Sequence, residues 1–223
     1  MFIFTFICSL FINKKREYEK PSRFFRKMLG ILTSIAFFAA RIRLHVSGEE
    51  LLPERNFLIV SNHISNFDPI LTWKFIGLDK IIFITKPENF KQPFFGRIIH
   101  RLGFLGIDRE NPRNALKTIQ KAAKVLKQGE MSVGVYPEGT RNRSAEGLLP
   151  FHNGSLKMAQ LAEVPIVVVY VRDSHLIAKH FPWKGTDVYL DILKVIPEEE
   201  VASGKTVDIG NSIREMMLKR AKA

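Results

Sequence analysis

The sequence predicts an α/β fold in which a central, mostly buried sheet is flanked by helices. From Arg41 onward, short β-rich runs alternate with helical segments, a pattern typical of βαβ units. Most strand candidates are continuous hydrophobic runs, as expected of strands buried on both faces. With 223 residues, of which 46% are hydrophobic, the chain can bury one sizeable core. We therefore expect one folded domain over residues 41–223, preceded by an appendage over residues 1–40.

The predicted elements follow one another in a regular order. RIRLHV (41–46) alternates polar and apolar residues, and Gly48 ends this strand. The other predicted strands are FLIVS (57–61), IIFIT (81–85), a brief strand near 104–107, MSVGVY (131–136), VPIVVVYV (164–171) and DVYLDILKV (187–195). Helices are predicted at 70–75, near 93–101, from Pro112 as first helical residue to a stop at Gly129, and from Asp208 to about Arg220.

The first forty residues consist of two apolar runs around a basic stretch. Residues 1–12 and 28–40 are apolar, and residues 13–27 carry seven Lys and Arg against two Glu. Neither run reaches the roughly 20 residues that a helix needs to cross a bilayer. The first run lacks the leader and cleavage site of a signal peptide, so we expect it to be retained. Two short apolar helices with basic and aromatic residues between them are typical of a segment lying in one leaflet on anionic head groups. Two helices that complete the core are the alternative.

Charge and cysteine content narrow the classes of partner. The net charge of +12 favours an anionic partner, which is a nucleic acid, a membrane surface or an anionic substrate. Nucleic acid is disfavoured because the densest basic stretch lies between apolar runs and no aromatic RNA-binding signature is present. The single cysteine, Cys8, excludes an internal disulfide and favours a reducing compartment. The histidines lack metal-ligand spacing, so no metal site is predicted.

A histidine and a carboxylate follow the second strand, in SNHISNFDP (61–69). Because the strand ends near Ser61, His63 falls at the carboxyl edge of the sheet, where α/β folds bind ligands. Asp68 and Pro69 are predicted as N-cap and first residue of the next helix. The turn between them would fold the carboxylate of Asp68 back onto the imidazole, fixing its tautomer and raising the basicity of the other ring nitrogen. The pair would then act as a general base toward a hydroxyl group.

Each of these residues has an ordinary structural explanation when it is taken alone. Asp68 is by itself a helix cap, and a single histidine is most often structural. Further polar clusters follow two other strands, however: YPEGTR (136–141), in which Gly139 permits a tight turn, and GIDR (106–109). Three polar clusters after three strands favour a shared site at the carboxyl edge of the sheet.

These motifs resemble those of the membrane glycerolipid acyltransferases that include the 1-acylglycerol-3-phosphate O-acyltransferases. The resemblance covers roughly residues 45–172. Its four blocks, in family order, are NHISNFD (62–68), GRIIHRLGFLGIDR (96–109), YPEGTR (136–141) and VPIVVV (164–169), and FHNGS (151–155) is similar to the family's Phe-x-x-Gly. Two departures are Tyr136, where Phe or Val is common, and the absence of a second proline in the fourth block.

The resemblance implies a glycerolipid acyltransferase fold and a general-base reaction without a covalent acyl-enzyme. His63 would deprotonate the sn-2 hydroxyl of lysophosphatidate, Asp68 would steady the imidazolium, and the alkoxide would attack the thioester of acyl-CoA or acyl carrier protein. The product would be phosphatidic acid. No cofactor is implied beyond the thioester co-substrate. The implied phosphate and glycerol site contains Arg109, Glu138, Gly139, Thr140 and Arg141, with Asn62 and Gly106 as supporting residues.

Two classes of function remain open at this stage. The first is the acyltransferase, bound to the cytoplasmic face of a membrane so that its lysolipid enters from the bilayer. The second is a non-catalytic lipid-binding protein, which would not need both His63 and Asp68. Within the first class, the rival acceptors are another lysophospholipid and glycerol-3-phosphate. Lys86 also follows a strand and could face the acidic head group, but we interpret it as a solvated lysine.

Overall fold

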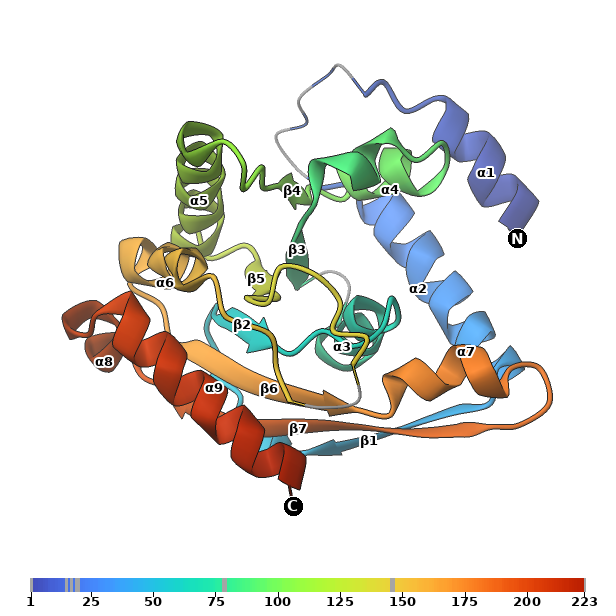
Figure 1. Ribbon diagram of the computed structural model, residues 1–223. Coiled ribbons are helices and arrows are strands. Elements are labelled where there is room, and N and C mark those ends of the chain that lie inside the picture. The colour runs from blue at the N-terminus through green and yellow to red at the C-terminus, as the bar shows by residue number, and fades with distance from the viewer. Residues whose placement is uncertain are drawn as a thin grey trace.

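The computed structural model describes residues 2–14, 16, 18, 21–77, 80–144 and 147–222 (Figure 1). Within this part of the chain, the strands form one sheet in the order β1-β7-β6-β2-β5-β3-β4. The strands are β1 (Ile42–Ser47), β2 (Leu58–Ser61), β3 (Ile81–Thr85), β4 (Leu105–Gly106), β5 (Ser132–Val135), β6 (Ile166–Arg172) and β7 (Thr186–Ile196). All neighbouring strands run parallel except β6 and β7, which are antiparallel. The α/β prediction is therefore confirmed.

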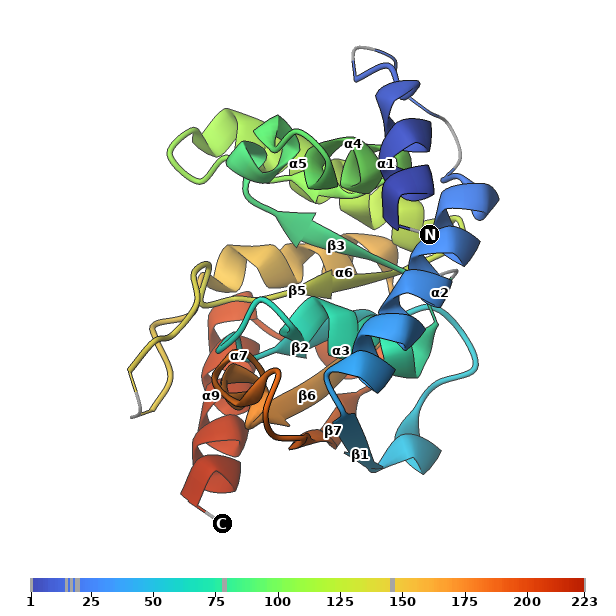
Figure 2. The same ribbon diagram turned by 90° about the vertical axis from the view of Figure 1, so that its right-hand side faces the viewer.

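Helices cover both faces of the sheet. Figures 1 and 2 show α5, α6, α8 and α9 on one face and α2 and α3 on the other. The helices are α1 (Phe2–Leu10), α2 (Arg23–Ala39), α3 (Asp68–Ile76), α4 (Phe95–Arg101), α5 (Pro112–Lys127), α6 (Lys157–Ala162), α7 (Ile177–His180), α8 (Glu198–Ser203) and α9 (Thr206–Lys222). The short helices α6, α7 and α8 were not predicted, because four to six residues are too few to display a helical period.

The central strands explain why the motifs meet. Every residue of β2 and β5 is buried, which accounts for the continuous apolar runs LIVS and SVGV. The two strands are parallel neighbours, with Val60 paired to Val135. Their carboxyl ends therefore lie at the same edge of the sheet. The loop that begins after Ser61 and the loop that begins at Tyr136 start side by side.

The long helix α5 forms as its sequence predicts. Asn111 is the N-cap, and its side chain accepts a hydrogen bond from the backbone N–H of Asn114. Pro112 is the first helical residue, where its missing N–H costs no intrahelical bond. Gly129, at φ 76°, adopts the left-handed conformation that stops the helix.

The N-terminal helices are only partly an appendage. Phe25, Met28 and Phe37 of α2 are buried in the main hydrophobic core, so α2 belongs to the packed domain. Its outer side nevertheless exposes Ile35 and Phe38, with relative exposures of 50% and 86%. Some residues of the predicted basic stretch, at positions 15, 17, 19 and 20, lie outside the described residues. In the described chain, no helix has both the length and the apolar character needed to cross a membrane.

Candidate active site

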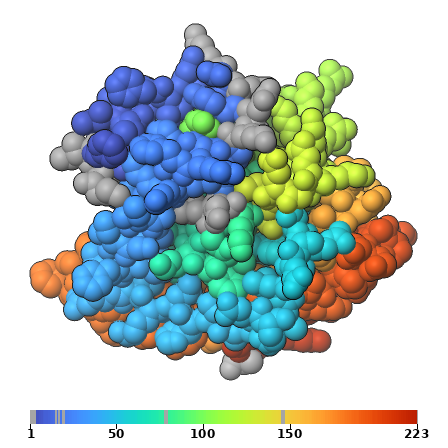
Figure 3. Space-filling view, turned by 180° about the vertical axis from the view of Figure 1, so that it is seen from behind, coloured from blue at the N-terminus to red at the C-terminus, as the bar shows by residue number. Residues whose placement is uncertain are grey.

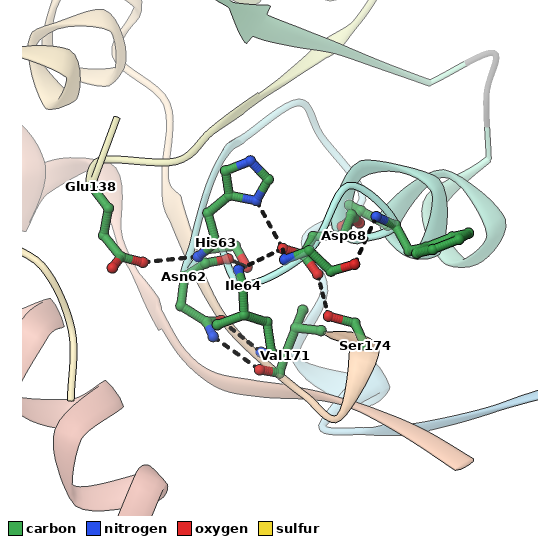
Figure 4. Close-up of polar contacts among 11 residues, drawn as sticks. Asn62, His63, Ile64, Asp68, Glu138, Val171 and Ser174 are labelled. Carbon is green, nitrogen blue, oxygen red and sulfur yellow. Dashed lines mark hydrogen bonds and ion pairs between the residues drawn. The ribbon is translucent and has the colours of Figure 1, made fainter. Parts of the chain in front are cut away.

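The predicted hydrogen bond between His63 and Asp68 is present. His63 lies just beyond β2, and its imidazole points toward Asp68 (Figure 4). Its Nδ1 is 2.8 Å from Oδ2 of Asp68. Asp68 is fully buried, whereas the imidazole side chain keeps 18% of its surface exposed. Because Nδ1 is occupied by the carboxylate, Nε2 is the ring nitrogen left for a ligand. The geometry is that of a general base oriented by a carboxylate.

Asp68 does not cap its own helix, and this part of the prediction was wrong. The helix begins at Asp68 itself, and the preceding residue, Phe67, makes no side-chain cap. Oδ2 of Asp68 instead accepts the backbone N–H groups of Ile64 and Ser65, each at 2.8 Å. The carboxylate thus closes the tight turn behind His63. Hydrogen bonds between backbone N–H groups and a carboxylate are strong and hold this buried side chain in place.

Ser174 provides the last hydrogen bond to Asp68, and sequence reasoning missed it. Its hydroxyl donates to Oδ1 of Asp68 at 2.5 Å, and the residue is fully buried (Figure 4). Ser174 lies in the 3₁₀ turn after β6, 106 positions along the chain from Asp68. No local sequence pattern predicts a contact between residues so far apart in the chain. It follows only from the pairing of β6 beside β2, with Ser61 opposite Val169.

Removing this hydroxyl should weaken the fold measurably. A hydrogen bond to a charged group is worth about 1.5–3 kcal/mol, so Ser174→Ala is expected to lower the free energy of unfolding by that amount. The measurement is urea denaturation of the purified protein. Ser203→Ala is the matched control, because its hydroxyl bonds a backbone carbonyl on an exposed helix end. An equal loss in both variants would contradict a special role for Ser174.

Asn62 ties the same two strands together, as a supporting residue. Its side-chain amide donates to the carbonyl of Val171 at 2.9 Å, and its Oδ1 accepts the N–H of Val171 at 2.7 Å. The side chain thus continues the ladder between β2 and β6 for one more residue after β2 ends. This contact fixes the position from which His63 leaves the sheet.

The loop after β5 holds the backbone of His63 from the other side. Oε1 of Glu138 accepts the N–H of His63 at 2.8 Å, and the N–H of Asn142 donates to the carbonyl of His63 at 2.7 Å. The other oxygen of Glu138 accepts the N–H of Leu149 at 2.9 Å. Both oxygens of the buried Glu138 carboxylate are therefore engaged with the backbone. Glu138 shapes the site by holding its loops, and Asn142, which the sequence did not single out, does so too.

Tyr136 forms one wall for the imidazole. Its ring stacks on that of His63 with centroids 4.3 Å apart and planes inclined by 23°. Burial, followed by the nearby charge of Asp68, raises the pKa of the Tyr136 phenol well above its usual value. The phenol is therefore neutral at physiological pH. Burial likewise raises the pKa of the Glu138 carboxyl, although its backbone hydrogen bonds act in the opposite direction.

A small polar cavity of about 180 Å³ opens beside the imidazole. This volume is below the range of about 300–1,000 Å³ typical of pockets for drug-sized ligands, so it suits a compact head group. The lining residues are His63, Asn66, Thr85, Lys86, Asn89, Arg109, Tyr136, Gly139, Thr140 and Arg141.

Three cations line this cavity. Arg109, Arg141 and Lys86 come from three separate loops, and none of them forms an ion pair with a carboxylate of the described residues. The cavity is therefore a site of positive potential prepared for an anion. Lys86, which we interpreted from the sequence as a solvated lysine, lies at this cavity. The signal for that position in the sequence was its place directly after the strand that ends at Thr85.

Arg109 lies directly over the turn at Gly139. A Cβ atom added to Gly139 would sit 1.4 Å from Nη1 of Arg109, and Gly139 has φ 73°. Only glycine therefore permits both the turn and the approach of the guanidinium group. Although Arg109 as a whole is exposed, the packing around its guanidinium group lowers its pKa by desolvation. His152 lies close enough to Arg109 that this cation, after burial, contributes to lowering the histidine's pKa.

Most of the predicted site residues therefore meet at one edge of the sheet. His63, Arg109, Gly139, Thr140 and Arg141 line the cavity, whereas the other four support it from behind. Of these four, Gly106 lies in β4, paired with Thr85, and its carbonyl accepts the hydroxyl of Thr118 at 2.7 Å. Gly106 thereby fixes the strand that leads to Arg109.

Comparison with known proteins assigns the chain to a family. Residues 43–172, more than half of the chain, match the Acyltransferase family. The chain belongs to this family. The matched range includes every predicted site residue from Asn62 to Arg141.

Several curated relatives carry the name 1-acyl-sn-glycerol-3-phosphate acyltransferase. A 1-acyl-sn-glycerol-3-phosphate acyltransferase of Borreliella burgdorferi is 27% identical over 196 residues, which cover 86% of this chain and 77% of that protein. The Haemophilus influenzae enzyme of the same name is 29% identical over 163 residues, covering 73% and 67%. The crystal structure of the 1-acyl-sn-glycerophosphate acyltransferase PlsC from Thermotoga maritima has a TM-score of 0.72 over 98% of this chain and 86% of that chain, at 23% identity. This last likeness establishes the shared fold.

Proposed function

We propose that the chain is a 1-acyl-sn-glycerol-3-phosphate acyltransferase, which moves a fatty acyl group from a thioester to the sn-2 hydroxyl of lysophosphatidate and forms phosphatidic acid. The observation that carries the proposal is the orientation of His63 by buried Asp68 beside a cavity lined by three unpaired cations. The base accounts for activation of a hydroxyl, and the cations account for an acceptor that carries phosphate. The names of the curated relatives support the same reaction.

The proton transfer begins at His63. Nε2 of the imidazole takes the proton of the sn-2 hydroxyl as its oxygen attacks the thioester carbonyl carbon. The imidazolium that forms is stabilised by the negative charge of Asp68 at Nδ1. A general base of this kind contributes typically about 100- to 10,000-fold to the rate. Holding the two substrates in line supplies a further part of the acceleration.

The acyl transfer itself needs no covalent intermediate on the protein. The tetrahedral intermediate collapses by breaking the carbon–sulfur bond, and the departing thiolate takes the proton from the imidazolium. One ester bond forms, one thioester bond breaks, and His63 returns to its neutral state. The only cysteine of the chain, Cys8, belongs to α1 and is absent from the cavity lining. The donor is acyl-CoA or acyl carrier protein, and both supply the same thioester.

Arg109, Arg141 and Lys86 bind the phosphate of the acceptor. Guanidinium groups fit phosphate oxygens in pairs, whereas a lysine acts as a point charge. Thr140 contributes a hydroxyl at the same wall, and the Gly139 turn brings the backbone close to the ligand. A bound phosphate would offset the desolvation of the Arg109 guanidinium group, which stays positively charged.

The enzyme works at the surface of a membrane containing anionic lipids, on its cytoplasmic face. The lysolipid acceptor is itself a membrane component, so access from the bilayer is required. The basic residues of the first forty positions and the exposed apolar side of α2 support this location. Because α2 also buries core residues, deletion of residues 1–40 would damage the fold. Substitutions on the outer side of α2 test attachment more cleanly.

The reaction is tested directly with purified protein, a radiolabelled acyl donor and a panel of acceptors. We expect lysophosphatidate to be converted to phosphatidic acid, and donors carried on CoA and on acyl carrier protein to be compared in parallel. Faster labelling of another lysophospholipid or of glycerol-3-phosphate would replace the acceptor in the proposal. Binding of lysolipid without any acyl transfer would replace the enzyme with a lipid-binding protein.

Replacing Arg109 should weaken the use of acceptors that carry a phosphate and leave the use of acceptors without one unchanged. Loss of hydrogen bonds to a charged group costs about 1.5–3 kcal/mol, so Arg109→Ala should raise the KM for lysophosphatidate by about 10- to 100-fold. Arg109→Lys should restore only part of the affinity, because an ammonium group keeps the positive charge but cannot form the paired hydrogen bonds of a guanidinium group. Monoacylglycerol, which lacks phosphate, should be used equally slowly by wild type and variant. Arg113→Ala on α5, which lies outside the cavity lining, is the matched control.

An equal fall in activity toward both acceptors would contradict the phosphate assignment. That result would mean that Arg109 supports the loop at Gly139 and does not contact the ligand.

A further inference from the structure

The turn between α7 and β7 presents aromatic side chains to solvent. Phe181 is 52% exposed and Trp183 is 86% exposed. The turn lies between His180, the last residue of α7, and Thr186, the first residue of β7. Nothing in the proposed catalytic site requires a large exposed indole. Such a residue, on a short turn outside the core, is typical of a contact with an interface between water and an apolar phase.

The turn is held firmly to the end of α2. The guanidinium group of Arg41 donates to the carbonyl of Pro182 at 2.6 Å, and the N–H of Thr186 donates to the carbonyl of Arg41 at 3.1 Å. Gly185 lies so close to the backbone of Arg41 that an added Cβ would be 3.0 Å from its carbonyl oxygen. The N–H of Lys184 also bonds the carbonyl of His180 at 2.8 Å. The indole is therefore presented by a structured turn at a fixed position.

The turn continues the exposed apolar side of α2. Ile31, Ile35 and Phe38 follow one another at helical spacing and are 43%, 50% and 86% exposed. Figure 1 shows the α7–β7 turn beside the C-terminal end of α2, and in Figure 3 the orange segment near residue 180 borders the blue helix along the same edge. The two apolar features thus belong to one side of the molecule.

The charges around the turn favour an anionic surface. Between Asp173 and Asp187 the chain has no acidic residue, and it carries Lys179 and Lys184. Both lysines are exposed, and neither forms an ion pair within the described structure. Arg41 adds a third cation at the same place. Asp187 stays ionised, since hydrogen bonds from Arg43 and His45 lower its pKa, and its negative charge is compensated by the ion pair with Arg43.

We propose that the turn of Phe181–Lys184 is a second membrane-binding element, which inserts Phe181 and Trp183 at the head-group level of an anionic phospholipid bilayer while Lys179 and Lys184 contact lipid phosphates. This inference rests on the proposed membrane location of the enzyme. Aromatic side chains at the interface combined with basic side chains on anionic lipid are the two contributions that bind a surface element to a bilayer. Contacts at two separate points, α2 and the turn, fix the orientation of the catalytic edge toward the membrane.

The two tryptophans of the chain allow a direct test. Trp73 is buried at 3% exposure against Phe83 and Phe104, so Trp73→Phe leaves Trp183 as the only indole and keeps an aromatic ring in the core. The full-length variant is mixed with vesicles of phosphatidylcholine and phosphatidylglycerol. We expect the emission of Trp183 to shift to shorter wavelength, and phosphatidylcholine with brominated acyl chains to quench it. The reciprocal variant, Trp183→Phe, should show neither change. If Trp73→Phe does not fold, subtracting the spectrum of Trp183→Phe from that of wild type isolates the same signal.

Binding and activity then separate the two proposals. Trp183→Ala should weaken vesicle binding by about tenfold, or about 1.4 kcal/mol, because it removes one large apolar contact with the bilayer. Leu116→Ala on α5 is the matched control, because Leu116 is 50% exposed and α5 lies on the opposite side of the molecule in Figure 1. Acyl transfer to lysophosphatidate in detergent micelles should be unchanged in Trp183→Ala. If the protein co-sediments with vesicles but the emission of Trp183 neither shifts nor is quenched, the inference is overturned. Quenching that occurs only when a partner protein is present would overturn it as well. A failure of the proposed function would appear separately, as no phosphatidic acid in micelles with wild type.

Discussion

Replacing His63 with alanine is expected to slow phosphatidic acid formation by about 100- to 10,000-fold, which is the usual contribution of a general base. An alcohol is a very weak acid, so without a base its oxygen attacks the thioester poorly. Residual activity should remain, because Arg109, Arg141 and Lys86 still hold the acceptor in the cavity. The KM for lysophosphatidate should therefore change much less than kcat.

The fold should survive this substitution. The imidazole is 18% exposed, and its removal leaves Asp68 with the N–H groups of Ile64 and Ser65 and the hydroxyl of Ser174. We expect a stability loss of about 1 kcal/mol, mainly from the stacking contact with Tyr136. Circular dichroism and urea denaturation check this point.

A second His–Asp pair in the same protein provides a matched control. Nε2 of His45 lies 2.9 Å from Oδ1 of Asp187, a distance like that in the proposed site. Asp187, however, is 40% exposed and shared with Arg43, and His45 is not among the residues that line the cavity. His45→Ala should retain activity within about twofold, because surface pairs of this kind contribute little energy. Full acyl transfer by His63→Ala would remove the base from the mechanism and leave the cavity as a binding site.

The sequence was sufficient to predict which residues meet, for a reason specific to parallel sheets. Polar residues after consecutive buried strands must gather at the carboxyl edge, wherever the strands fall in the sheet. His63 after β2, Arg141 after β5 and Arg109 after β4 could therefore be expected at one edge of the sheet. They line one cavity because β2, β5, β3 and β4 are neighbours in the strand order. The same logic applies to Lys86 after β3, which lines the cavity and is also exposed to solvent.

The residues that position the catalytic pair were not predictable in this way. Ser174 reaches Asp68 only because β6 lies next to β2. The hydrophobic pattern of a strand does not predict which strands are its neighbours. Only the N-cap predicted for Asp68 was wrong, for a related reason. A carboxylate before proline at a helix start satisfies the general rule for an N-cap, yet the tight turn after β2 offers two closer backbone donors. The antiparallel pairing of β6 with β7 was equally hidden, because a buried strand has the same pattern in either direction.

Replacing Asp68 with asparagine is expected to reduce kcat by about 10- to 100-fold while the fold remains intact. An amide oxygen can accept the N–H groups of Ile64 and Ser65 and the Nδ1–H of His63, and the amide NH₂ can donate to the hydroxyl oxygen of Ser174. The hydrogen-bond geometry is thereby kept, and the negative charge is removed. A charge-assisted hydrogen bond is worth about 1.5–3 kcal/mol, which sets the size of the expected loss.

The double variant tests whether Asp68 acts through His63. If the carboxylate serves to orient and stabilise the imidazolium, then His63→Ala combined with Asp68→Asn should be no slower than His63→Ala alone. Asp68→Ala should behave differently from Asp68→Asn, because it leaves buried N–H donors without an acceptor and so costs about 1–3 kcal/mol of stability for each. Additive losses in the double variant, or full activity in Asp68→Asn, would reduce Asp68 to a structural clamp of the turn. The charge of the aspartate, separated in this way from its hydrogen bonds, is what the mechanism requires.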